Sequence, residues 1–441
     1  MLDRLRRLHP FQTPDTQRLA ILFAVVYFAQ GMWALPNQTL IITLKERGLS
    51  AGQVATFFTF SIIPWLIKPA YGLLSDCVPL FGQRRRSYLL LTSALAAGAG
   101  LAMGLAVPHS YWWLAGLFTV MGLGLAFTDV LVDALMVENG KPRGLTGAFQ
   151  AVQWGAIYTA SVLVGELGGF LAERRSLSAA FVLAALFPLI SFCMTLFVVH
   201  DPPAHADREA FRQTMGAIRA ALGERDLWIV AGFIFFWTFS PSFGPALLYY
   251  QTDVLTFSQQ FIGHLGALGS LAAVGGAFIY APLSRRVPLK RLINFSIGVG
   301  VAGTLAYLLY RGAWSAVVID TVFGCVGMIT QLAFLDLAAK SCPRCVEATF
   351  FALLMSVFNG GTQSSQVVGS YLYDWLGYTA LVLISAAFTA VAWFLVPLTA
   401  SRSRRGRSPS RLPAERRVAL DLGRLEHARA SPGTKRQERQ G

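Results

Sequence analysis

Long apolar runs separated by short polar gaps dominate the chain. Between Leu19 and Leu44 no residue is charged, and about 20 apolar residues suffice for a helix to cross a bilayer. In lipid, the backbone groups of such runs must be satisfied internally, which favours helices. The pattern predicts an all-α integral membrane protein with twelve transmembrane helices, near residues 19–44, 51–74, 87–107, 112–137, 145–172, 178–199, 226–251, 259–284, 289–310, 313–340, 347–373 and 377–399.

The composition indicates the same class. Hydrophobic residues make up 54% of the 441 residues and charged residues only 14%, whereas a soluble domain is about 25% charged. The first apolar run is too long for a signal-peptide core, and Pro36-Asn37-Gln38 follows it in place of a small-residue cleavage site. We therefore predict that this run is a retained helix.

The net charge of +14 is distributed unevenly. If the amino terminus lies in the cytoplasm, 31 of the 37 Lys and Arg residues fall in cytoplasmic loops and termini, and Lys68 falls inside a helix. The external loops then hold only Lys45, Arg47, Arg174, Arg175 and Arg311. This positive-inside asymmetry predicts that both termini are cytoplasmic. It also explains the basic charge without a nucleic-acid partner.

The two halves of the chain resemble each other. Three pairs of segments occur in the same order in each half: 71–80 with 280–289, 142–143 with 343–344, and 167–171 with 368–372. Two parallel six-helix repeats are typical of the major facilitator fold. We therefore predict two pseudo-symmetric six-helix bundles.

The domain boundaries follow from the polar stretches. The expected parts are a cytoplasmic amino terminus (1–18), an amino-terminal bundle (19–199), a cytoplasmic linker with an amphipathic helix (200–225), a carboxy-terminal bundle (226–399) and a basic tail (400–441). The tail is rich in Arg, Ser, Pro and Gly, which predicts disorder. It either touches anionic lipid at the inner leaflet or is merely solvated.

A charged loop between the second and third spans is a candidate gating element. As in major facilitators, it carries a Gly-x-x-x-Asp pattern followed by basic residues, here Gly72, Asp76, Arg84, Arg85 and Arg86. Such charges can pair with helix ends when the inner side is closed. The alternative is that the arginines only set the topology.

Several segments resemble the folate–biopterin transporter family of the major facilitator superfamily. They are Pro64–Asp76 with Val78–Tyr88, Asp129–Asp133 through Glu138, and Cys342–Ser356 with Asn359. The similarity runs from about Gln30 to Leu398. The resemblance implies secondary active uptake of folates or pterins by alternating access, coupled to protons. Some relatives handle other metabolites.

Lys68, Asp129 and Asp133 are charged residues within predicted spans, where charge is costly and tends to be functional. Lys68 and Asp129 lie at comparable depth, roughly 9–12 Å from the cytoplasmic end at 1.5 Å per residue, and Asp133 lies one turn below Asp129. We expect an ion pair of Lys68 with one of the aspartates. Its role is either a structural lock or a proton and substrate site.

A folate-like molecule needs a carboxylate or amide for its ring edge, an aromatic face for stacking and a cation for its anionic tail. Polar and aromatic stripes on spans one, two, five and eleven are candidates to line such a cavity: Gln30, Trp33, Asn37, Trp65, Gln150, Gln153, Trp154, Tyr158, Asn359, Gln363 and Gln366. Each stripe could instead serve interhelical hydrogen bonds. Glu166 and Asp320 are further candidates for protonation, or face the external vestibule.

Two other functions stay open and a third is excluded. The chain could be a facilitator for another solute, such as a muropeptide, a sugar or a nucleoside, or it could be a pigment-delivery factor. An enzyme is rejected because no nucleophile–base pair, metal cluster or phosphate-binding loop is present. Cys342-Pro-Arg-Cys345 lacks the second pair of ligands that zinc needs. We expect no cofactor, a small-molecule substrate with protons and membrane lipid as partners, a monomer, and a location in the cell inner membrane.

Overall fold

Helices form almost all of the chain that the computed structural model describes. The described residues are 11–106, 110–201, 203, 212, 215, 216, 219, 222, 223, 225–287, 289–341 and 347–400. The first half contains α2 (Pro14–Met32), α3 (Asn37–Glu46), α4 (Ala51–Leu66), α5 (Lys68–Cys77), α6 (Arg86–Leu105), α7 (Tyr111–Gly140), α8 (Thr146–Glu173) and α9 (Leu177–Val198). The second half contains α11 (Arg225–Thr238), α12 (Pro245–Asp253), α13 (Gln259–Arg286), α14 (Leu289–Ala306), the 3₁₀ turn η1 (Tyr307–Leu309), α15 (Ala313–Ser341) and α16 (Glu347–Ala400).

The helices have the length and composition of membrane spans. Nine helical segments of the described chain are long and apolar enough to cross a bilayer, and two shorter apolar helices cover 227–238 and 294–309. One of the nine, Ala352–Val391, contains a kink at Gly377, where φ is 81°. The all-helical membrane architecture is therefore confirmed, while the count of twelve spans stays a prediction.

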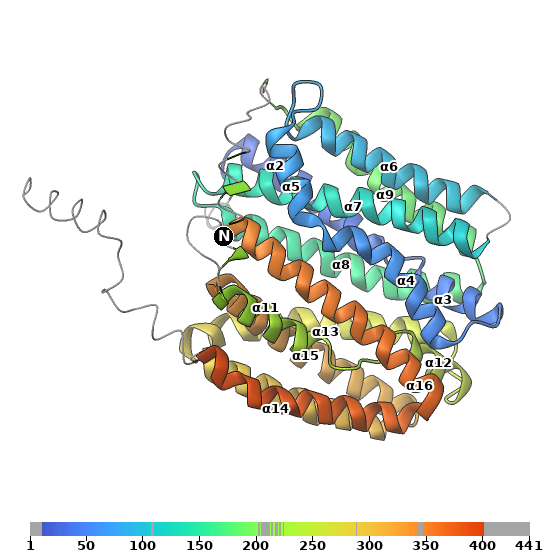
Figure 1. The fold of residues 1–441 in the computed structure, drawn as a ribbon. Helices are drawn as coiled ribbons and strands as arrows, with labels where there is room; N and C mark the ends of the chain where they lie inside the picture. The colour runs from blue at the N-terminus through green and yellow to red at the C-terminus, as the bar shows by residue number, and fades with distance from the viewer. Residues whose placement is uncertain are drawn as a thin grey trace, which may run out of the picture. The chain divides into compact units, whose positions relative to one another are not determined.

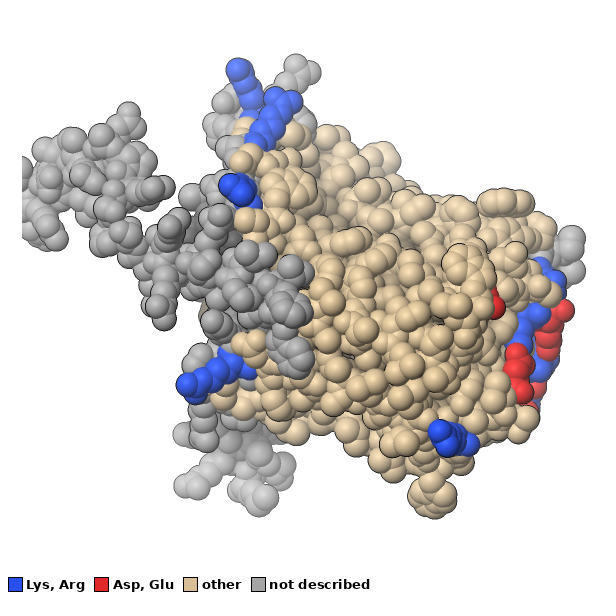
Figure 2. Space-filling model, turned by 60° about the horizontal axis from the view of Figure 1, so that its bottom comes forward, with Lys and Arg blue, Asp and Glu red and all other residues tan. Residues whose placement is uncertain are grey.

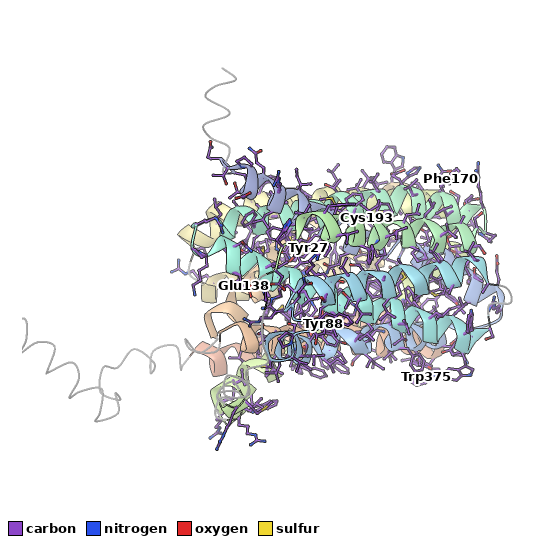
Figure 3. The ribbon with its side chains drawn as sticks, turned by 90° about the horizontal axis from the view of Figure 1, so that it is seen from above. Tyr27, Tyr88, Glu138, Phe170, Cys193 and Trp375 are labelled. Atoms are coloured by element: carbon purple, nitrogen blue, oxygen red, sulfur yellow. The ribbon has the colours of Figure 1, made fainter. Side chains whose placement is uncertain are left out.

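Charged side chains lie mainly near the ends of the helices. Figure 2 shows Lys, Arg, Asp and Glu gathered toward two opposite ends of the molecule, with a broad uncharged band between them on that face. Glu138 lies toward one end of the helices, and Phe170 and Trp375 lie at the other (Figure 3). Below, the end with Glu138 is called the inner end and the end with Phe170 and Trp375 the outer end, following the predicted topology.

Three of the spans are broken rather than continuous. Span one stops at Met32 and resumes at Asn37, span two is divided at Ile67, and span seven is interrupted between Thr238 and Pro245 (Figure 1). Proline lacks the amide hydrogen of the helix ladder and its ring clashes with the preceding turn. In span seven, Pro241 lies within the interruption and Pro245 begins α12, so the helix is fully broken there.

The break in span seven is supported by a neighbouring helix. The Ser365 hydroxyl on α16 donates to the Ser240 carbonyl at 2.5 Å, and the Ser242 amide donates to the Ser365 carbonyl at 3.2 Å. Gly244 takes φ of 44°, which a residue with a side chain rarely adopts. Irregular backbone at membrane depth is tolerated where protein groups satisfy it.

Small residues allow the helices to pack closely. A side chain at Gly124 on α7 would lie 2.5 Å from the Thr92 carbonyl on α6, and one at Gly100 would lie 2.8 Å from the Ala185 side chain on α9. Membrane helices associate through such close packing because lipid provides no hydrophobic drive between them. A continuous apolar core with Phe23, Phe118 and Phe181 fills the first half.

Some predictions lie on residues outside the described part of the chain. These predictions are the amphipathic helix of the linker 200–225, most of whose residues are not described, the disordered tail from 401 on, and the Cys342 and Cys345 pair. The domain boundaries themselves therefore stay predictions.

Candidate functional site

The break in span two places Lys68 at the first position of α5. Pro64 lies in the last turn of α4, Ile67 has non-helical backbone angles, and Pro69 occupies the second position of α5. The amino-terminal end of a helix carries partial positive charge. A lysine there is unfavourable unless a carboxylate compensates it.

Asp129 on α7 supplies this carboxylate. Lys68 Nζ lies 2.6 Å from Asp129 Oδ2, and the two side chains are only 15% and 5% exposed. Lys68 Nζ also lies 4.6 Å from the centre of the Trp65 ring, a cation–π distance. Of the two pairings expected for Lys68, the structure holds the one with Asp129.

Asp133 has neutral partners instead. The Tyr27 hydroxyl on α2 donates to Asp133 Oδ1, and Gln153 Nε2 on α8 donates to the same oxygen at 3.5 Å. Tyr27 is fully buried. Among the residues that the structure describes, Lys68 is the only cation that forms an ion pair with Asp129 or Asp133. Two carboxylates one helical turn apart therefore share one positive charge.

Tyr27 was missed by reasoning from the sequence. Its signal is its spacing: it precedes Gln30 by three residues, and therefore lies on the same face of α2 as a residue that was predicted to line the cavity. A tyrosine in an apolar run looks like a core residue until the neighbouring helix is known.

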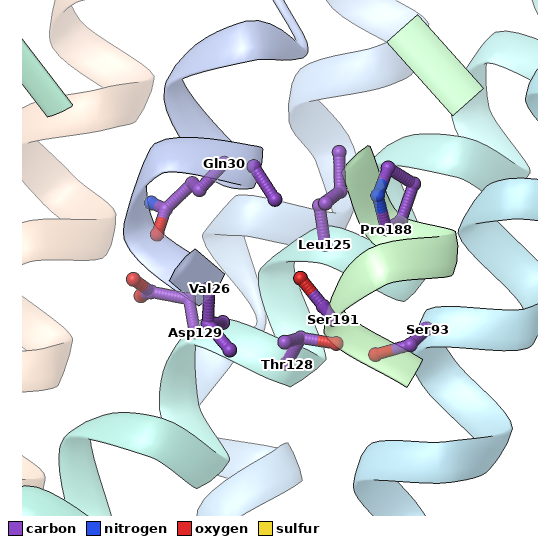
Figure 4. Close-up of a pocket in the computed structure, with 9 residues that line it drawn as sticks. Val26, Gln30, Ser93, Leu125, Thr128, Asp129, Pro188 and Ser191 are labelled. Atoms are coloured by element: carbon purple, nitrogen blue, oxygen red, sulfur yellow. The ribbon is translucent and has the colours of Figure 1, made fainter. Parts of the chain in front are cut away.

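A small polar cavity adjoins Asp129. Its volume is about 10 Å³, and Figure 4 shows the ends of Gln30 and Asp129 on one side of it and Ser93, Thr128 and Ser191 on the other. This is room for about one water molecule, and such a water needs two to four polar partners. Gln30 Oε1 and Ser93 Oγ are buried without a hydrogen-bond partner in the described chain. The cavity therefore offers a polar position beside the carboxylate that one water molecule can occupy.

Trp65, which contacts the lysine, stacks on a second indole. The rings of Trp33 and Trp65 are 5.5 Å apart and inclined by 19°. Both indole nitrogens, together with Asn37 Oδ1, are buried without a hydrogen-bond partner in the described chain. Leaving such groups unpaired costs about 1–3 kcal/mol each. This cost is removed if a polar ligand bonds to them.

The predicted polar face of span one is not a continuous helical stripe. Gln30 lies in α2, Trp33 lies in the turn, and Asn37 is the first residue of α3. The physical reason is Pro36, which ends the regular helix ladder. The structure still places Trp33 against Trp65 and Gln30 beside Asp129.

Of the polar stripe on span five, only Gln153 contacts the Lys68, Asp129 and Asp133 group. Gln153 bonds to Asp133, while Trp154 and Tyr158 stack on each other at 6.1 Å between ring centres. The Tyr158 hydroxyl lies 3.3 Å from the sulfur of Met328 in the other half. Gln150 is exposed.

On span eleven, Gln363 bonds to α4 of the other half. Its Nε2 donates to the Ala55 carbonyl at 3.1 Å and to Thr59 Oγ1 at 3.2 Å. Asn359 and Gln366 are partly buried. For Gln363 the interhelical alternative therefore describes the contacts in this conformation.

Glu166 and Asp320 lie apart from Lys68. Glu166 Oε2 is 2.7 Å from His264 Nδ1 on α13. Asp320 accepts hydrogen bonds from the Tyr307 hydroxyl at 3.0 Å and the Tyr310 hydroxyl at 2.7 Å, all within the second half. Neither carboxylate contacts the Lys68 group.

The candidate gating loop is organised by Arg85. Arg85 Nη2 lies 2.5 Å from Asp76 Oδ1 and 2.7 Å from Glu138 Oε1, and its side chain is 5% exposed. Burial lowers the pKa of Arg85, but Glu138 and Asp76 raise it above its ordinary value. Asp76 also contacts Arg84 at 3.5 Å, and Arg86 Nη2 donates to the Leu196 carbonyl at 3.1 Å. All of these bonds stay within the first half.

Known proteins resemble this chain over most of its length. A model described as the BT1 family matches residues 29–397. The folate-biopterin transporter of Synechocystis sp. is 33% identical over 382 residues, which cover 83% of this chain and 76% of that protein. Probable folate-biopterin transporter 4 of Arabidopsis thaliana is 25% identical, with 81% and 89% covered, and folate transporter 1 of Plasmodium falciparum is 23% identical, with 85% and 75% covered.

Solved structures share the fold. The crystal structure of a D-xylose-proton symporter matches with a TM-score of 0.68 at 14% identity, covering 86% of this chain and 96% of that one. The nucleoside transporter NupG matches with a TM-score of 0.66 at 14% identity, covering 88% and 99%. Both are major facilitators, so the all-helical major facilitator fold predicted from the sequence is confirmed, while the count of twelve helices stays a prediction.

Proposed function

Because the chain belongs to the BT1 family of membrane transporters, we propose that it imports folates or pterins by proton-coupled alternating access. The family resemblance predicted from the sequence motifs is confirmed, and so is the prediction of a transporter rather than an enzyme. The chain is a multi-pass membrane protein that moves a small molecule. Substrate, coupling ion and direction are the proposal.

One observation carries this proposal: a largely buried cation lies beside the buried Asp129, the partly buried Asp133 and a pair of stacked indoles. Trp33 and Trp65 offer an aromatic face for a flat heterocyclic ring. The unpaired acceptors of Gln30 and Asn37 can bond to the donor-rich edge of the ring. Lys68 offers a cation for an anionic tail. These are the groups that a folate-like molecule requires.

Charge balance supports coupling to protons. Asp129 and Asp133 carry two negative charges against the single charge of Lys68, and excess charge within the membrane is costly. One proton on the Asp133 carboxylate makes the group neutral and keeps the Lys68–Asp129 pair intact. An anionic substrate that binds Lys68 weakens the ion pair between Lys68 and Asp129. Asp129 then needs another positive charge, which a proton supplies. Proton and substrate binding thus favour each other.

The gating loop has a separate role in the same proposal. Asp76, the partner of Arg84 and Arg85 in this conformation, exchanges these partners for helix ends of the second half when the inner side closes. Gly72 has no neighbour that a side chain would clash with closely, the nearest being Val130 at 3.6 Å. It therefore leaves room for this movement.

We further propose the membrane setting that the charge distribution predicts. Both termini lie in the cytoplasm, the location is a bacterial inner membrane, and the transporter acts as a monomer in contact with lipid. The two six-helix bundles, 19–199 and 226–399, move relative to each other around the Lys68 group. The orientation is tested with epitope tags on both termini. We expect antibodies to reach both tags only after the cells are permeabilised.

The proposed substrate is tested by uptake into cells that express the protein. Labelled folic acid, a reduced folate and biopterin are supplied with and without a protonophore. We expect uptake of at least one of the three above that of cells without the protein, and its loss with the protonophore. Uptake that ignores the protonophore contradicts proton coupling. Expression at the membrane without uptake of any of the three favours another solute, for which muropeptides, sugars and nucleosides are the alternatives.

A further inference from the structure

Carboxylates from each half sit on helix ends of the other half at the outer end. Glu173 Oε2, at the end of α8, accepts from the amide of Gln259 at 2.6 Å and from the amide of Gln260 at 3.3 Å. Asp374 on α16 accepts from the amide of Ala51 at 3.2 Å and from the amide of Gly52 at 2.8 Å. In both cases the donors are the first two residues of a helix, α13 or α4.

The two contacts are related by the internal repeat. Glu173 lies two residues after the segment 167–171, and Asp374 lies two residues after the matching segment 368–372. Their targets also match, because α4 and α13 each begin directly after a serine cap, Ser50 or Ser258. A chance contact has no reason to recur at the equivalent place with the same donors.

The serine caps leave these donors for the opposite half. Ser50 Oγ accepts from the third amide of α4, on Gln53, and Ser258 Oγ accepts from the third amide of α13, on Phe261. The first amides of a helix have no partner within it. Each helix start is therefore completed only when the carboxylate of the other half is in place.

A third contact between the two halves is an ion pair. Lys45 forms an ion pair with Asp253, and these residues precede Ser50 and Ser258 by the same five positions. Lys45 and Asp253 therefore occupy equivalent positions in the two halves, and the ion pair joins these positions to each other. Glycines also bring helices of the two halves together: side chains at Gly165 and Gly169 on α8 would lie 2.6 Å and 2.9 Å from carbonyls of α13.

We propose that Glu173 and Asp374 are a symmetric pair of outer clamps that hold the outer end closed and set the population of the outward-open state. Opening the outer end separates both carboxylates from their helix starts. A carboxylate at an exposed helix start changes an equilibrium by about two- to fivefold. Since the clamps are in different places and share no partner, their effects multiply. This role holds for any solute that the protein carries.

The clamps are tested with a cysteine that opening exposes. Thr59 on α4 is partly buried and bonded to Gln363 of the other half. In Thr59→Cys, reaction with a membrane-impermeant maleimide applied from outside reports opening, and the chain with only its five native cysteines gives the background. We expect Glu173→Gln and Asp374→Asn each to raise the labelling rate about two- to fivefold, and the double variant about four- to twenty-five-fold. Glu173→Lys should exceed Glu173→Gln, because it places a cation at the helix start.

The matched control is Glu46→Gln. Glu46 is also a carboxylate near the outer end, but its ion pair with Arg175, at 2.5 Å, stays within the first half. Its labelling rate should equal that of the parent. An unchanged rate in the double variant overturns the proposal, and so does an equal rise in the control. Labelling needs no substrate, so the result stands whether or not the chain transports folates.

Discussion

Replacing Lys68 with methionine is expected to abolish transport and to lower the free energy of unfolding by about 3–5 kcal/mol. Removing one partner of a buried ion pair leaves the other charge uncompensated, which has an effect of this size. The pair is largely buried, since the side chains of Lys68 and Asp129 are 15% and 5% exposed. Unfolding in detergent and uptake in cells measure the two effects separately.

A second change separates structure from function. In Lys68→Met with Asp129→Asn no uncompensated charge remains at the pair, so most of the lost stability should return. Transport should not return, because the cation for the substrate is missing. Lys45→Met is the control: its partner Asp253 is 51% exposed, so the loss should stay below about 1 kcal/mol. Full activity of the double variant contradicts the proposed role of Lys68.

Replacing Asp133 with asparagine is expected to stop accumulation of substrate against its gradient while exchange continues. The amide keeps the polar contacts to Tyr27 and Gln153 possible, but it is permanently neutral, like the protonated carboxylate. The variant therefore behaves as if always loaded with its proton. Counterflow in proteoliposomes should stay near the parent level, whereas uptake driven by a proton gradient should stop at equilibrium.

Asp320→Asn is the matched control for this prediction. Asp320 is also a carboxylate with tyrosine hydroxyl partners, but it lies in the second half and away from Lys68. Accumulation should survive this change. If Asp320→Asn stops accumulation and Asp133→Asn does not, the proton site lies in the second half and the proposed assignment is wrong.

The sequence predicted the features that follow from burial in lipid. Apolar run length located α6 at 86–105 against an expected 87–107, and depth alone brought Lys68 to the level of Asp129. The expected ion pair of Lys68 with an aspartate was also found, because an unpaired charge in a membrane is costly enough to require a partner. The family could be identified from the sequence because its motifs cluster in the charged loop and on spans two, four and eleven.

Contacts between distant helices could not be predicted in the same way. The role of Tyr27 depends on α2 facing Asp133 of α7, which no local pattern reveals. The break at Ile67 follows from Pro64 and Pro69 together, yet membrane helices often continue through a single proline when neighbours satisfy the backbone. Glu173 and Asp374 resembled ordinary loop charges because their partners are backbone amides of the opposite half.

The most direct test of the account is proton uptake driven by substrate. Purified protein is reconstituted into liposomes with a pH indicator inside, and a folate or pterin that the cells take up is added outside. The account predicts acidification of the interior by the parent protein, and none by Asp129→Asn or Asp133→Asn at equal protein content. Acidification by both variants at the parent rate would show that the carboxylates beside Lys68 do not carry the proton.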